Sequence, residues 1–64
     1  MMPLALADMG TENIIRRIGG SLEDLGFVAG GSATVVSSLG GNLIVKVKES
    51  RVAISEEMAR KIMI

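Results

Sequence analysis

The stretch that decides the fold is "SATVVSSLGGNLIVKVKESRVAI", residues 32–54. It consists of three short runs rich in β-branched residues, and a glycine pair separates the first run from the second. The alternation of side chains is clearest in residues 43–48, where Leu43, Val45 and Val47 would point to one face of a strand. This pattern predicts three consecutive strands joined by tight turns.

The predicted boundaries follow from the turn residues. We expect a strand at 32–38 and a turn at 39–42, because the two glycines of that turn can adopt positive φ without steric cost. The second strand ends before a tight reversal at 49–50, and the third strand covers 51–54. The residues that we expect to form the core of this sheet are Val35, Val45, Val47, Val52 and Ile54.

Outside this stretch, the elements are short. Three isoleucines and a closing glycine pair favour a strand at 11–18. Residues 21–26 read as one helical turn, in which Ser21 caps the start and Gly26 provides the left-handed residue at the end. A second short helix is expected after the cap residue Ser55, followed by final β residues at 62–64.

Together, these elements make a mainly β chain of about five short strands with one or two very short helices. Such chains close their sheet into a small barrel, which reduces exposed strand edges. The 64 residues are enough for one small domain, which we place at 1–64. In this reading, the glycines are the corners at which the strands bend.

Composition excludes several classes of function. The chain has no histidine and no cysteine, so it lacks the usual general base and nucleophile of enzymes, and only carboxylates are available as charged metal ligands. Basic and acidic residues balance at seven each, and Phe27 is the one aromatic residue, which argues against nucleic-acid binding. No apolar run approaches the roughly 20 residues that span a bilayer. We expect no catalytic, cofactor-binding or metal site.

Three segments together carry a family resemblance. They are "LGFVAGG" at 25–31, the central strand region, and "SRVAISEEMARKIMI" at 50–64. The combined string resembles the FeoA family, small cytosolic accessories of the bacterial FeoB ferrous-iron transporter, and the opening "PLALADMGTENIIRRI" also fits. The chain departs from the family in its shorter helix before Gly26 and in Ala29, where proline is common.

The resemblance implies a partly open SH3-like barrel and a role in ferrous-iron uptake. The leading hypothesis is a non-enzymatic, cytoplasmic protein that docks on the cytosolic domain of a FeoB-like transporter and modulates it. Through this partner, the protein would lie at the inner face of the membrane without inserting into it. The alternative is a detached regulatory module like the carboxy-terminal domain of iron-dependent DtxR-type repressors. A third hypothesis is a weak homo-oligomer whose strands pair between chains.

The docking surface is expected to be partly apolar. A one-turn helix cannot bury all its sides, so we expect Leu25 to turn inward with Phe27 and Leu22 to stay partly exposed as an anchor for the partner. Leu39 and Ile44 are further candidates for the same contact. The predicted partner-binding residues are therefore Leu22, Leu25, Leu39 and Ile44.

Overall fold

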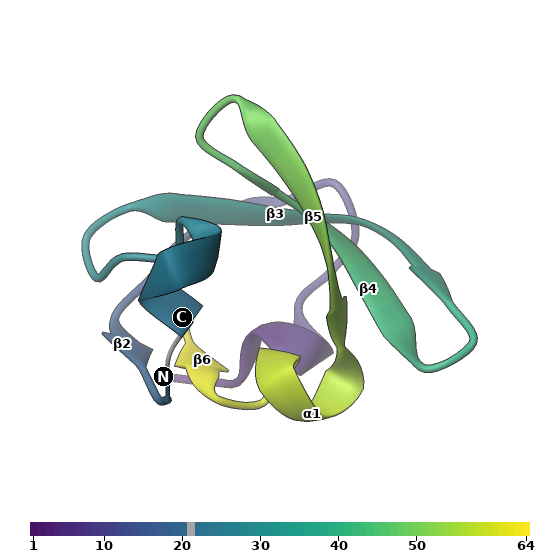
Figure 1. Ribbon diagram of the computed structural model, residues 1–64, viewed down its shortest axis with the longest axis horizontal. Helices are drawn as coiled ribbons and strands as arrows, with labels where there is room; N and C mark the ends of the chain where they lie inside the picture. Colours follow the sequence, from purple (N-terminus) through teal and green to yellow (C-terminus); the bar gives the residue numbers. More distant parts are fainter. Residues whose placement is uncertain (21) are drawn as a thin grey trace.

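Three consecutive strands form the centre of the computed structural model, which describes residues 1–20 and 22–64. Strands β3 (Ser32–Leu39), β4 (Asn42–Val47) and β5 (Ser50–Ser55) are antiparallel neighbours, and β1 (Glu12–Ile14) adds to the other side of β3. The resulting sheet has the order β1-β3-β4-β5 (Figure 1). The predicted strands at 32–38, 43–48 and 51–54 are confirmed to within about one residue at each end, an ordinary margin for element boundaries.

The buried face of this sheet is the predicted one. Val35 lies opposite Val45, which in turn lies opposite Val52, so one row of valines crosses three strands. Val47 and Ile54 are also buried, whereas Val52, in the same edge strand as Ile54, is half-buried. The other buried apolar residues of the sheet are Ala33 and Leu43.

The turns need unusual backbone geometry. The β3–β4 hairpin turns at Gly40 and Gly41, whose φ angles of 58° and 82° lie in the left-handed region that glycine adopts readily. The β4–β5 hairpin turns at Lys48 and Glu49, one residue earlier than the predicted reversal at 49–50. Lys48 has a φ of 55° there, although it is not a glycine.

The predicted strand at 11–18 is divided in two. Its first part is β1, and its second part is β2 (Arg17–Ile18), which pairs with β6 (Ile62–Met63) in a separate two-stranded sheet. The chain changes partner between them: the Ile15 N–H donates to the Gly31 carbonyl at 2.8 Å, and the Arg16 N–H donates to the Met63 carbonyl at 2.7 Å. The prediction of one continuous strand at 11–18 was therefore wrong, because its two halves form hydrogen bonds with different neighbours.

The two termini close the structure. The backbone groups of Met2 and Ile64 exchange two hydrogen bonds of 2.9 and 2.8 Å, and Pro3 forms an isolated bridge with Met63. Strand β6 consequently lies between the first residues of the chain and β2, with both its edges paired. Figure 1 shows the two termini side by side at this point.

The helical segments are each about one turn long. They are the 3-10 helices η1 (Leu4–Leu6) and η2 (Leu22–Leu25) and the α-helix α1 (Glu56–Ala59). Gly26 ends η2 with a φ of 97°, as predicted, while the predicted capping role of Ser21 lies outside the described residues. Within residues 1–20 and 22–64, no helix is long and apolar enough to cross a membrane.

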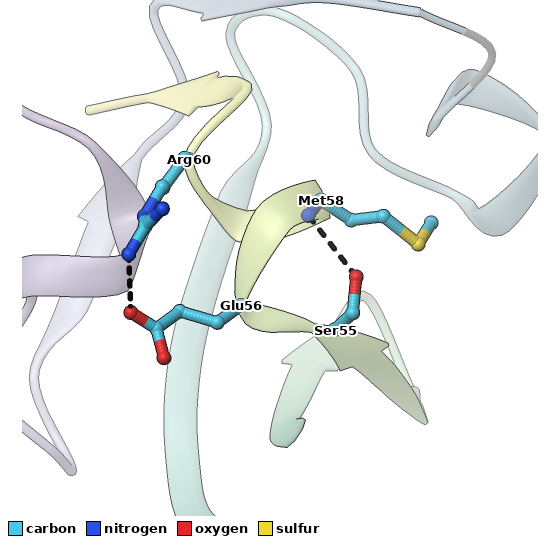
Figure 2. A network of polar contacts seen from close by, with 4 residues as sticks. All are labelled: Ser55, Glu56, Met58 and Arg60. Atoms are coloured by element: carbon cyan, nitrogen blue, oxygen red, sulfur yellow. Dashed lines mark hydrogen bonds and ion pairs between the residues drawn. The ribbon is translucent and has the colours of Figure 1, made fainter. Parts of the chain in front are cut away.

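Figure 2 shows how α1 begins and ends. The Met58 N–H donates to Ser55 Oγ at 3.2 Å, so the predicted cap is confirmed. One turn later, Arg60 Nη2 donates to Glu56 Oε1 at 2.8 Å across the exposed side of the helix.

The core joins both sheets. Phe27, which follows η2, is fully buried, as are Leu4 of η1 and Ile62 of β6. Ile15 is also fully buried, at the point where the chain passes from one sheet to the other. The architecture is the expected one: a mainly β, partly open SH3-like barrel, with six strands among the described residues rather than about five.

Candidate interaction surface

The two leucines of η2 have the opposite placement to the one predicted. Leu22 is 3% exposed and belongs to the core, whereas Leu25 is 39% exposed. In a 3-10 helix, residues three apart lie on the same side. The spacing of the two leucines therefore does not predict which of them is buried and which is exposed. The expectation that Leu22 is exposed and Leu25 turns inward was wrong. Leu22 is therefore not available as a surface anchor.

The tip of the β3–β4 hairpin carries the most exposed of the large apolar side chains described. Leu39 is 80% exposed and lies opposite Asn42 in the ladder. Ile44 is two residues further along β4, on the same face as Asn42, so Leu39 and Ile44 are diagonal neighbours on the outer face of the sheet. Ile44 is half-buried and pairs with Ala53 of β5.

A bulge adds a third apolar side chain to this region. The register between β3 and β4 shifts between Val35 and Ser37, which leaves Val36 as an extra, exposed residue beside the pair of Ser37 and Ile44. We call Val36, Leu39 and Ile44 the hairpin patch. Val36 was not among the predicted partner-binding residues, because a bulge leaves no mark in a run of valines and serines.

Leu25 lies at the other end of the sheet. Gly26, the next residue in the chain, lies close to Val47 at the end of β4. Glycine has no Cβ atom, but one added to Gly26 would lie 3.9 Å from Val47 Cγ2. The hairpin patch lies toward the beginning of β4: along the extended strand, Ile44 is about 10 Å from Val47, and the position opposite Leu39 is about 17 Å from it. The four predicted residues therefore do not form one site. Leu39 and Ile44 lie together, Leu25 is separate, and Leu22 is in the core.

Charged side chains occupy the middle of the outer face. One row across the sheet consists of Glu12, Thr34, Lys46 and Arg51, in strand order. Lys46 and Arg51 are exposed and directly opposite each other, although like charges in this position repel. In the described part of the chain, the pair of Glu56 and Arg60 in α1 is the one ion pair.

The described residues form no enclosed chemical site. No pocket is present among them, and no three acidic side chains come together in a way that could hold a metal ion. No buried polar or charged side chain occurs among them either. The exposed features include the hairpin patch, Leu25 and the basic pair of Lys46 and Arg51, which suit contact with another macromolecule. Other exposed apolar side chains include those of Met1, Leu6, Met9 and Ile14.

Comparison with known proteins extends these observations. A family model described as the FeoA domain matches residues 2–64, a range that includes all the described strands and helices. No curated protein matches the chain. Among solved structures, the chain is similar to the crystal structure of an iron uptake regulatory protein (FeoA), with 27% sequence identity and a TM-score of 0.83. The similarity covers 95% of this chain and 89% of the other.

Proposed function

Because the chain belongs to the FeoA family, we propose that it acts in ferrous-iron uptake as a small accessory protein that docks on the cytosolic side of a FeoB-like transporter and modulates it. The observation that carries the proposal is the family match over residues 2–64. The similar crystal structure, described as that of an iron uptake regulatory protein, supports the same process.

The chemistry of the chain supports binding rather than catalysis. It contains neither histidine nor cysteine. The serines that the structure describes lie in two strands, Ser32, Ser37 and Ser38 in β3 and Ser50 and Ser55 in β5. Its effect on a transporter would therefore come from contact. A contact of this kind gains most of its free energy from a few apolar residues near the centre of the buried surface.

The hairpin patch is the proposed contact. Leu39 protrudes from a tight turn, with Ile44 and Val36 beside it, so a partner can cover the three side chains together. Leu25, at the far end of the sheet, is the proposed second contact. Leu22 is excluded because its side chain contributes to the core.

The test is a pull-down from detergent-solubilised membranes of iron-limited cells. The tagged chain should retain a FeoB-like transporter, and Leu39→Ala should reduce the retained amount by about fivefold or more, which corresponds to about 1 kcal/mol. Leu6→Ala is the matched control, since Leu6 is 68% exposed on η1 and lies outside the hairpin patch. Leu25→Ala measures the second contact separately.

Each negative outcome has a distinct meaning. If the unmodified chain retains no transporter from the membranes but retains a soluble repressor from the soluble fraction of the same cells, the chain is a regulatory module of the DtxR type. If the transporter binds and the variants of Leu39 and Leu6 behave alike, the docking hypothesis stands but the hairpin patch is not the contact.

A further inference from the structure

Strand β5 has the longest unpaired edge in the described part of the molecule. It pairs with β4 over all six of its residues, and no strand of the described chain pairs with its other side. The opposite edge strand, β1, has only three residues, and β6 is paired on both edges. Figure 1 shows the β4–β5 hairpin projecting from the body of the protein. Unpaired edges of this kind are templates for a further strand.

The hydrogen bonds show which residues face the open edge. The Glu56 N–H continues the β4–β5 ladder and donates to the Gly41 carbonyl at 3.0 Å. Antiparallel strands alternate the direction of their backbone groups, so even-numbered residues of β5 point toward β4. The backbone groups of Arg51 and Ala53, and the N–H of Ser55, therefore point away from β4, and no backbone hydrogen bond among the described residues satisfies them.

We propose that this edge pairs with the same edge of a second copy, antiparallel and with the twofold axis at Ala53. In this register Ala53 lies opposite Ala53 of the other copy, and Arg51 lies opposite Ser55. All the outward-pointing residues of β5 then have partners. The two four-stranded sheets become one sheet of eight strands, and each half-buried Val52 gains a neighbour on the inner face.

Charge favours this register over the other symmetric ones. A twofold axis at Arg51 would place two arginines opposite each other, next to both Lys46 side chains, and the repulsion would oppose pairing. With the axis at Ala53, Arg51 instead lies beside Ser55 and the acidic residues that follow it, Glu56 and Glu57. Because Glu56 is paired with Arg60 of its own copy, Glu57 is the carboxylate that offsets the repulsion between Lys46 and Arg51 of the other copy.

The proposed pairing of two β5 edges stops at a dimer, and the dimer is weak. A twofold contact uses the same edge of both copies, so it ends at a dimer and does not propagate into fibres. Two strands of six residues bury less than the roughly 1,200 Å² typical of stable interfaces. We therefore expect a dissociation constant on the order of 100 μM.

Sedimentation equilibrium of the full chain tests the proposal. Between about 10 μM and 1 mM, the average mass should rise from monomer toward dimer and no further. Ala53→Pro removes the N–H that points to the open edge and adds a ring there, so it should weaken self-association about tenfold or more. Ala53→Ser is the matched control, because it keeps the N–H and should keep the dimer.

A charge reversal provides a second arm if the proline variant does not fold. Arg51→Glu places a carboxylate beside Glu56 and Glu57 of the other copy, and it should weaken the dimer by a similar factor. Adding Glu57→Lys to the same chain should restore association. A chain that is monomeric at all these concentrations would overturn the proposal. So would a dimer that neither Ala53→Pro nor Arg51→Glu affects.

Discussion

Leu22 and Leu25 show how much one residue's surroundings matter in a chain this small. Both are leucines of the same one-turn helix, yet Leu22 is part of the core and Leu25 is at the surface. A buried leucine contributes through the apolar area that it removes from water and through the cavity that its loss would leave. An exposed leucine contributes little of either, so the two positions should respond very differently to the same substitution.

Leu22→Ala should lower the free energy of unfolding by about 2–5 kcal/mol, the usual range for a core leucine, whereas Leu25→Ala should change it by less than about 1 kcal/mol. Urea denaturation of the two variants and the unmodified chain measures both values. Equal effects at the two positions would contradict the placement of η2 on the core.

At the scale of elements, the register of β3, β4 and β5 determines which face is buried. A shift of one residue would exchange the apolar and charged sides of β4. The two hairpin turns hold the register, and the bulge at Val36 resets it in the second half of β3. The same bulge places Val36 beside Ile44 and so enlarges the hairpin patch.

Val47→Ala tests the register of β4. Val47 is buried at the end of the strand, so the loss of its methyl groups should cost about 1–3 kcal/mol of unfolding free energy. The neighbouring Lys46 points to the outer face, and Lys46→Ala should change stability by about 0.5 kcal/mol or less. Thermal or urea unfolding compares them. A larger effect at Lys46 than at Val47 would mean that the faces are reversed.

At the scale of the whole molecule, closure depends on β6. This strand has only two residues, but it pairs with β2 on one side and with the segment of Met2 and Pro3 on the other. Ile62 of this strand is fully buried in the core. A small domain has few contacts to spare, so the short strand has a large share in stability.

Ile62→Ala should therefore destabilise the chain by about 2–5 kcal/mol, a large fraction of a total near the low end of the usual 5–15 kcal/mol. Ile64→Ala is the comparison, since Ile64 is only half-buried and should cost less. Circular dichroism during heating measures both. A melting temperature for Ile62→Ala equal to that of the unmodified chain would show that β6 is not needed for closure.

How far the candidate site was predictable differs from residue to residue. Leu39 stands beside two turn glycines, and a turn tip has little around it to cover a side chain, so its exposure agrees with its local sequence. Leu22 has no such local signal, and Leu25, which also precedes a glycine of positive φ, was nevertheless predicted to turn inward with Phe27. The role of Leu25, Leu39 and Ile44 in binding remains a prediction for the pull-down to test.

The sequence by itself determined the central strands, their inward faces and the glycine turn of the first hairpin, because alternation along a strand and positive φ at a turn are properties of neighbouring residues. It also determined the cap at Ser55, which joins atoms three residues apart. Only the tertiary structure decided that residues 11–18 serve two sheets, that β6 lies between β2 and the first residues of the chain, and that Leu22 rather than Leu25 is buried. These features depend on backbone pairing and packing between segments far apart in the chain, and no local pattern encodes which distant segment will be the neighbour.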